Sequence, residues 1–201
     1  MEEPLIVILH THGIGGRLAI LPRLYTLIKR VRARADAPHY LVDSGESCAP
    51  DVWPCDVTGG RAVLIALDAM GYDAAYVGGA LDEANYAKLA DTVMMGLVRR
   101  GSVHRRDDLI FTAEHQPPPA PDGLRHVVVT PDDQRRSTTD CVYLKTNAQT
   151  GVGITMIYDD MVIYDFAPLT PETLPDATIS GAVDFIHDEA RYYDKQRRKS
   201  D

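Results

Sequence analysis

Seven histidine and acidic side chains lie where strands of this sequence are expected to end or just beyond. Imidazole and carboxylate groups bind divalent metal ions and also move protons in hydrolytic reactions. In an open α/β sheet, the segments beyond the carboxyl ends of the strands form the cleft in which ligands bind. These side chains are therefore candidates for such a cleft: His10, His12, Asp43, Glu46, Asp82, Glu83 and His115.

Several of these side chains also have a structural explanation. His10 alternates with apolar residues of a strand, so its ring would pack beside that strand. Asp43 opens a turn and would accept hydrogen bonds within it. Asp82 and Glu83 stand at the start of an expected helix, where acids cap the free N–H groups and suit the positive end of the helix dipole. We favour the structural interpretation, because acids at helix starts are common for that reason.

Two other kinds of site have only part of their signature here. Residues 13–16 read Gly-Ile-Gly-Gly after a strand, but they lack the full glycine spacing of a dinucleotide-binding loop, and no Lys-Ser or Lys-Thr pair accompanies them. Ser44 and Ser47 flank Glu46 without the Gly-x-Ser-x-Gly turn that exposes a nucleophilic serine. Neither phosphate cradling nor nucleophilic catalysis therefore has specific support.

The first half of the chain alternates between strand and helix patterns. Residues 5–9 form an unbroken apolar run, typical of a central strand buried on both faces. Strand and helix in alternation predict parallel strands with right-handed crossovers. Met94 and Met95 are expected to fill the core. The expected strands are residues 5–9, 40–42, 74–77 and 109–112, and the expected helices carry apolar residues at 21–31, 63–70 and 86–97.

The second half changes character after the prolines at residues 117–119. Four apolar segments follow, and the last two flank Asp159-Asp160, which predicts a tight hairpin. We expect an antiparallel sheet here, followed by an amphipathic helix over residues 179–190 that runs into a polar tail. The fold class is therefore α/β. The four segments are residues 126–130, 141–145, 152–158 and 161–166.

Composition and charge limit the class of protein. The 201 residues are 45% hydrophobic and 25% charged, so we expect one domain over residues 1–201, with a βαβ half at 1–116 and an antiparallel half at 124–194. A formal net charge of −8 argues against nucleic acid as a partner. The sequence has no segment resembling an export signal or a membrane span, so we expect no membrane partner and a cytoplasmic protein.

The cysteines fit the same expectation of a reduced compartment. Cys48, Cys55 and Cys141 are odd in number and lack the paired Cys-x-x-Cys spacing, which argues against a disulfide framework and against a structural zinc site. Cys48 and Cys55 bracket a loop, which leaves a bridge between them open. In a reduced compartment we expect buried free thiols instead.

Three phrases of the first half follow one another in a specific order. Residues 8–16 read ILHTHGIGG, residues 41–46 read LVDSGE, and residues 71–81 read GYDAAYVGGAL. They resemble the phrases ILHTNDxHG and LLDAGD, and the GYDA turn and strand leading into GNHE, of the 5′-nucleotidase type of calcineurin-like metallophosphoesterase. The hairpin, residues 165–169 and the last helix also resemble the end of that catalytic domain. The resemblance implies a metallophosphoesterase-like layered sandwich.

The resemblance also implies a reaction from which this sequence departs. Enzymes of the family hold two metal ions that activate a bridging water for phosphoryl transfer. Here Gly13 and Gly15 stand at the family's Asp and His, Gly79 at its Asn, and Ala80 at its second His. None of these replacements has a side chain that binds metal. Only Glu46, at the bridging Asp, keeps a carboxylate, and its extra methylene shifts the oxygens.

These departures set the functional expectation. We expect a non-catalytic protein with no metal or other cofactor, and we assign no catalytic or metal-binding residue. It would act as a binding or interaction subunit, holding a partner protein, a second copy of itself, or a small molecule in the vestigial cleft at the strand ends. The alternative is a 5′-nucleotidase-like hydrolase, a metal-dependent phosphoesterase in which the seven candidates hold Mn, Zn or Mg in a rearranged site. His115 is then the only candidate for the family's later histidines.

Overall fold

The computed structural model describes residues 3–79, 81–132 and 134–200. The strands are β1 (Ile6–Thr11), β2 (His39–Asp43), β3 (Ala74–Tyr76), β4 (Gly96–Val98), β5 (Val103–Arg106), β6 (Leu109–Thr112), β7 (Arg125–Val128), β8 (Cys141–Tyr143), β9 (Gly151–Ile157) and β10 (Val162–Pro168). The helices are α1 (Leu21–Arg32), α2 (Trp53–Thr58), α3 (Arg61–Ala69), α4 (Glu83–Ala90) and α5 (Ala177–Ser200), and Leu18–Ile20 form a short 3-10 helix.

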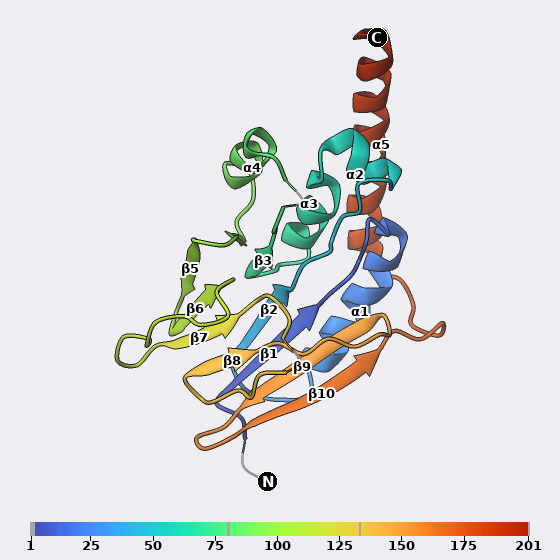
Figure 1. Ribbon diagram of the computed structural model, residues 1–201. Helices are drawn as coiled ribbons and strands as arrows, with labels where there is room; N and C mark the ends of the chain where they lie inside the picture. The colour runs from blue at the N-terminus through green and yellow to red at the C-terminus, as the bar shows by residue number, and fades with distance from the viewer. Residues whose placement is uncertain (1–2, 80, 133, 201) are drawn as a thin grey trace.

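The strands form two sheets. A six-stranded sheet has the order β10-β9-β1-β2-β3-β4, and a four-stranded sheet has the order β5-β6-β7-β8. β1 to β4 pair in parallel, and β9 pairs antiparallel with β1 on the other side (Figure 1). The carboxyl ends of β1, β2 and β3 therefore meet at one edge of the larger sheet, where the vestigial cleft was expected.

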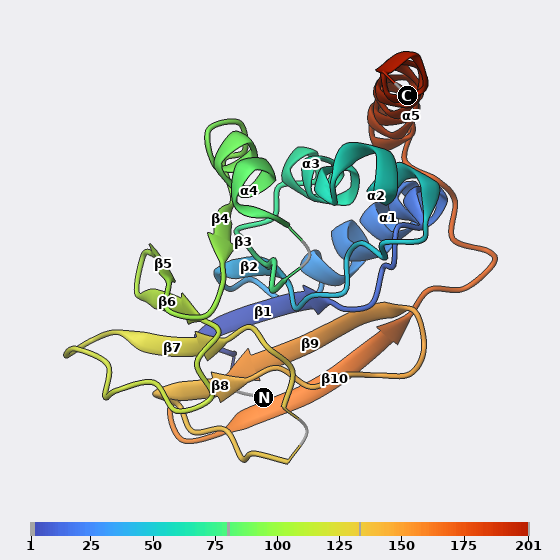
Figure 2. The same ribbon diagram turned by 45° about the horizontal axis from the view of Figure 1, so that its top comes forward.

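The sheets and helices make three layers. Helices α1, α2, α3 and α5 cover one face of the larger sheet, and the smaller sheet lies on the other side (Figure 2). Alternation along β1 follows this arrangement, because Val7 and Leu9 belong to the core beneath the helices and Ile6 and Ile8 to the core between the sheets. A strand apolar on both faces is thus explained by burial from both sides, and the α/β layered fold is confirmed.

The third helix is shorter than its apolar spacing predicted. Helix α4 ends at Ala90, and Leu97 lies in β4, a strand that the sequence analysis missed. The carboxylate of Asp68 accepts hydrogen bonds from the backbone N–H groups of Met94 and Met95, which holds the chain in a turn there. Met95 is buried as expected, but Met94 is 91% exposed, so its assignment to the core was wrong.

The second half is only partly antiparallel. The β9–β10 hairpin forms as predicted and extends the larger sheet. Strands β7 and β8, expected to be antiparallel, pair in parallel with their neighbours in the smaller sheet. The reason is connection length: after β6 and after β7 the chain makes long loops that return it to the same end, whereas an antiparallel pair would suit a short turn.

The loop after β2 contains two features that the sequence analysis did not expect. Helix α2 follows the loop, and Cys55 within it forms a disulfide with Cys48. The two Cα atoms lie 5.6 Å apart, a distance that a disulfide spans readily. The expectation of free thiols was therefore wrong for this pair, because α2 turns Cys55 back toward Cys48; Cys141 is free.

Helix α5 closes the helical layer. It packs against α1, α2 and α3, with Ile179, Val183, Ile186 and Ala190 turned inward. It continues as helix through most of the expected polar tail, and its end projects beyond the other helices (Figure 1). Across the described parts of the chain, no helix has both the length and the apolar character that a membrane crossing requires.

Candidate functional site

The loops after β1 and β2 lie directly against each other at the carboxyl edge of the larger sheet. They are joined by backbone hydrogen bonds between their main chains. Backbone groups that bond each other are no longer free to bind a ligand. The three bonds run from the N–H groups of Gly13, Gly15 and Gly16 to the carbonyl oxygens of Gly45, Glu46 and Ser47, over 3.0, 2.8 and 2.8 Å respectively.

Glycine is required in the loop after β1 by its backbone. Gly13 has φ +65° and Gly15 has φ +61°, in the left-handed region that L-residues adopt at a cost of about 1–2 kcal/mol. A Cβ on Gly13 would lie 3.8 Å from Oε2 of Glu46, so there is space for a side chain. The backbone conformation, and not crowding, therefore opposes a metal-binding side chain at this position.

Glu46 and His12 are brought together across the two loops. Oε2 of Glu46 lies 3.5 Å from Nε2 of His12, and Nδ1 of the same ring lies 3.3 Å from the carbonyl oxygen of Ser44. Glu46 itself has φ +55°, which is rare for a residue with a side chain, and its carboxylate is 78% exposed. This is a strained, solvent-facing acid beside an imidazole, and strain of this kind often marks a functional position.

Asp43 is buried and bonded within the protein. Its carboxylate accepts hydrogen bonds from the hydroxyl of Thr11 at 3.0 Å, from the N–H of Gly45 at 3.1 Å, and from the hydroxyl of Ser47. Burial raises the pKa of Asp43 to about 6, although these three donors favour the charged form and oppose the rise. Tyr72 bonds Thr11 in turn, so Asp43 belongs to a buried network beneath the helices.

His10 and His115 both contact groups from the second half of the chain. The His10 ring points into the space between the sheets, where Nε2 lies 2.8 Å from the carbonyl oxygen of Lys145. His115 follows β6 and places Nδ1 3.3 Å from a carboxylate oxygen of Asp132. His10 also lines a small cavity, of about 10 Å³, together with His12.

Asp82 and Glu83 serve helix α4. Asp82 accepts the N–H of Asn85 at 2.7 Å and so caps the helix, and Glu83 forms an ion pair with Arg99 at 2.7 Å. This is the capping arrangement that the structural interpretation of the sequence described. Both carboxylates are thus engaged on α4 and β4 and not at the ends of β1 and β2.

The donor set does not fit a two-metal centre. Of the seven candidates, the structure places His12 within 3.5 Å of Glu46 and brings His10 beside His12 in a small cavity. Each metal of a two-metal centre needs several oxygen or nitrogen ligands that converge on it. Within residues 3–79, 81–132 and 134–200, no group of three His, Cys, Asp or Glu side chains is placed to hold a metal ion. Gly79 faces open space, and the replacement at Ala80 lies outside the described residues.

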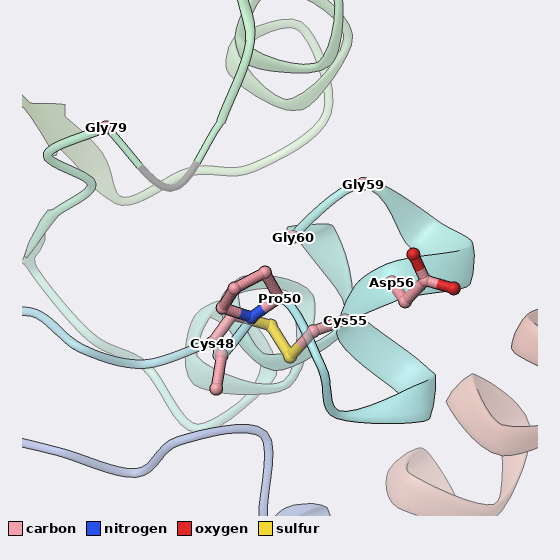
Figure 3. Close-up of a pocket in the computed structure, with 8 residues that line it drawn as sticks. Cys48, Pro50, Cys55, Asp56, Gly59, Gly60 and Gly79 are labelled. Atoms are coloured by element: carbon pink, nitrogen blue, oxygen red, sulfur yellow. A yellow bond between two sulfur atoms is a disulfide. The ribbon is translucent and has the colours of Figure 1, made fainter.

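Two adjoining cavities lie at this edge, and the contribution of Pro50, Gly59 and Gly60 to their lining was not foreseen from the sequence. One, of about 260 Å³, lies between Pro50 and the Gly59-Gly60 turn that joins α2 to α3 (Figure 3). The other, of about 250 Å³, lies beside Glu46. Cys48 and Gly79 line both cavities, so the disulfide helps to shape this edge. The Gly-Gly pair was the one sequence signal for the turn.

Comparison with known proteins supports the fold. No protein-family model matches the chain, and no curated protein matches its sequence. Among solved structures, the chain is similar to the calcineurin-like phosphoesterase YfkN from Bacillus subtilis, with a TM-score of 0.63 and 10% identity over 96% of this chain and 99% of that one. It is also similar to a 5′-nucleotidase precursor from Thermus thermophilus (TM-score 0.62, 12% identity, 93% and 59%) and to the NAD nucleotidase NadN of Haemophilus influenzae (0.58, 9%, 95% and 61%).

The extent of the match differs among these structures. The chain spans nearly all of the YfkN chain but only about three fifths of each nucleotidase. At 9–12% identity the likeness concerns the fold and not the reaction. The chain thus has the fold of the calcineurin-like phosphoesterases, as the three phrases at its strand ends predicted.

Proposed function

We propose that this protein does not catalyse phosphoester hydrolysis and acts by binding. The observation that carries the proposal is the edge of the sheet where β1 and β2 end, because the two loops there bond to each other through three backbone hydrogen bonds and present glycine at Gly13 and Gly15. Two metal ions need a set of carboxylate and imidazole ligands on both loops. The described residues offer one such pair, His12 and Glu46.

A second candidate function rests on that same pair. Glu46 keeps a strained backbone and an exposed carboxylate within 3.5 Å of His12, which is an arrangement a rearranged single-metal site would use. Under this alternative the protein is a metal-dependent phosphoesterase with Mn, Zn or Mg bound at Glu46. The buried position of Asp43 counts against it, because this second acid of the region faces away from the solvent.

Metal analysis combined with an activity assay separates the two functions. Purified protein is tested for bound metal and for hydrolysis of nitrophenyl phosphate with manganese, zinc and magnesium. We expect no stoichiometric metal and no turnover above that of two variants. Glu46→Gln alters the acid that lies beside His12, and Asp51→Asn alters an acid outside that pair. Stoichiometric metal together with turnover that is lost in Glu46→Gln but kept in Asp51→Asn would establish the alternative.

The binding half of the proposal has its own test. We infer that the protein holds a partner protein, a second copy of itself, or a small molecule in the cavities beside Cys48 and Gly79. Native mass spectrometry and light scattering of the purified protein would show an oligomer or a bound molecule. A protein that is strictly monomeric and carries no ligand would contradict this half while leaving the absence of catalysis intact.

The cytoplasmic location expected from the sequence remains a prediction. The Cys48–Cys55 disulfide argues for an oxidising environment, because disulfides seldom persist where thiols are kept reduced. Trapping the thiols with an alkylating agent at the moment of cell lysis would decide between the two, since a reduced pair gains two labels and a bridged pair gains none.

A further inference from the structure

A half-buried amine bonds to the backbone of the loop between β7 and β8 at two of its described residues. Nζ of Lys145 donates hydrogen bonds to the carbonyl oxygens of Asp132, at 2.6 Å, and of Arg135, at 2.5 Å. The carboxylate of Asp132 accepts the backbone N–H groups of Gln134 and Arg135, which closes a turn. An ammonium group has three donors, so these two carbonyls leave one N–H of Lys145 for another acceptor. The amine also lies over the ring of Tyr164, with Nζ 5.8 Å from the ring centroid.

Ser137 connects the same loop to strands β8 and β10. Its hydroxyl oxygen accepts the backbone N–H of Tyr143 at 2.8 Å, and it is also bonded by the hydroxyl of Tyr164 on β10. Thr138 accepts the N–H of Cys141 at 3.2 Å. A loop fixed at several points loses little further freedom when a ligand binds it, which favours affinity.

A cavity of about 360 Å³ lies between this loop and the turn of the β9–β10 hairpin. Arg136 lines it, is exposed, and makes no hydrogen bond or ion pair with the described residues. A guanidinium group carries five N–H donors in a planar fork that matches two oxygens of an oxyanion. The polar lining includes Arg135, Arg136, Thr138, Thr139, Lys145 and Asp160.

The charge of this cavity differs from that of the chain. Three cationic side chains face one carboxylate in its lining, Asp160, whereas the whole chain has a formal charge of −8. Arg135 is partly neutralised by Asp132 at 3.1 Å. Arg136 and the remaining N–H of Lys145 are the donors left for a ligand, and the hydroxyl of Thr139 lies in the same lining.

We propose that this cavity, here called the oxyanion pocket, binds a tetrahedral oxyanion: phosphate or sulfate, free or carried on a small molecule. The fork of Arg136 takes two oxygens, and Lys145 and Thr139 donate to the others. Lys145 also lines the small cavity at His10 and His12, but no residue that lines the oxyanion pocket comes from the loops after β1 and β2. The proposal involves no hydrolysis, so it goes beyond the proposed function and stands or fails separately from it.

Calorimetric titration at low ionic strength tests the proposal with three probes: inorganic phosphate, sulfate and phenyl phosphate. We expect saturable binding of at least one with a Kd of about 1 mM, the range in which a few charge-assisted hydrogen bonds suffice. Arg136→Gln should weaken it at least about tenfold. Arg100→Gln, which alters an exposed arginine on a turn elsewhere, should bind as the wild type does.

A second variant protects the test against misfolding. Arg136→Lys keeps the charge and loses the fork, so it should bind more weakly than the wild type and more tightly than Arg136→Gln. Tighter binding of phenyl phosphate than of inorganic phosphate would identify an ester as the ligand, and the reverse order would identify the free anion. The proposal is wrong if the wild type shows no binding up to about 10 mM of any probe, or if a folded Arg136→Gln binds unchanged.

Discussion

The loops that end β1 and β2 and the loop between β7 and β8 use their polar groups in opposite ways. In the first region, N–H groups and carbonyls of Gly13, Gly15 and Glu46 bond within the protein, and the region's buried acid, Asp43, faces inward. In the second region, internal bonds hold Asp132, Arg135 and Ser137, whereas Arg136 lines a cavity and makes no hydrogen bond or ion pair with the described residues. In the first region these backbone groups are thus used within the protein, whereas the donors proposed for an oxyanion lie in the second region.

The largest expected effect concerns Asp43 and pH. Its folded pKa of about 6 lies above the ordinary 3.8, so the stabilisation from its protonated form is fully present below about pH 4 and is lost as pH rises through 6. Between pH 4 and 7 the unfolding free energy of the wild type should fall by up to about 3 kcal/mol relative to that of Asp43→Asn. Urea titrations across this range measure the difference.

A control variant isolates the buried group. Asp51→Asn alters an exposed acid, and its difference in stability from the wild type should stay constant with pH within about 0.5 kcal/mol. If the difference in unfolding free energy between the wild type and Asp43→Asn is equally independent of pH, then Asp43 is not a buried acid that faces inward.

The disulfide comes next in size. Removing it in the double variant Cys48→Ser/Cys55→Ser should lower the unfolding free energy by about 2–3 kcal/mol, because the bridge closes a short loop in the unfolded chain. Reductant should bring the wild type to the same value and leave the variant unchanged. Cys141→Ser, which alters the free thiol, should lose stability on reduction as the wild type does, because it keeps the bridge. Equal unfolding free energies of the double variant and the wild type would show that the bridge does not stabilise the fold.

Restoring a ligand at Gly13 should fail. Gly13→Asp adds the acid of the metallophosphoesterase phrase but must adopt φ near +65°, so we expect a loss of about 1–2 kcal/mol and no gain in manganese binding. Gly123→Asp is the matched control, because Gly123 also has a positive φ, of 78°, and has open space around it. Tight manganese binding by Gly13→Asp alone would mean that the loop still accommodates a metal centre.

The smallest effect concerns the strain at Glu46. Glu46→Gly should be more stable than Glu46→Ala by up to about 1 kcal/mol, since both remove the carboxylate but only glycine relieves the left-handed backbone. Thermal unfolding of the two variants gives the comparison. If Glu46→Ala is as stable as Glu46→Gly, the backbone of Glu46 is not strained. Strain would then no longer support a residual function at His12 and Glu46.

The sequence predicted what depends on local pattern. The apolar run of β1, the helix entered at Pro22, the stop at Gly71 and the hairpin at Asp159-Asp160 all have local causes, and all are present. The predicted helix runs past the end of α4, because Val93 and Leu97 continue a helical spacing. The turn between them is held by Asp68, which lies far from it in the sequence. The parallel pairing of β7 likewise depends on tertiary arrangement and not on local pattern.

The candidate site shows the same limit. The replacement of metal ligands at Gly13 and Gly15 is visible in the sequence, but their positive φ and the bonds between the two loops are not. The sequence does not show whether Asp43 is buried or exposed, because this depends on how far the helices cover the end of its strand. No sequence pattern distinguishes Arg136 from the other arginines. It becomes a candidate for binding only because the structure places it in the lining of a cavity.

Anomalous diffraction from crystals soaked in manganese chloride would show whether a metal ion binds where β1 and β2 end. We expect no anomalous peak between the loops that follow these strands, because those loops bond to each other and their described residues lack a set of ligands. A peak within about 2.0–2.6 Å of Glu46 carboxylate oxygens or of His12 Nε2 would contradict it, since that is the distance at which oxygen and nitrogen ligands hold divalent ions.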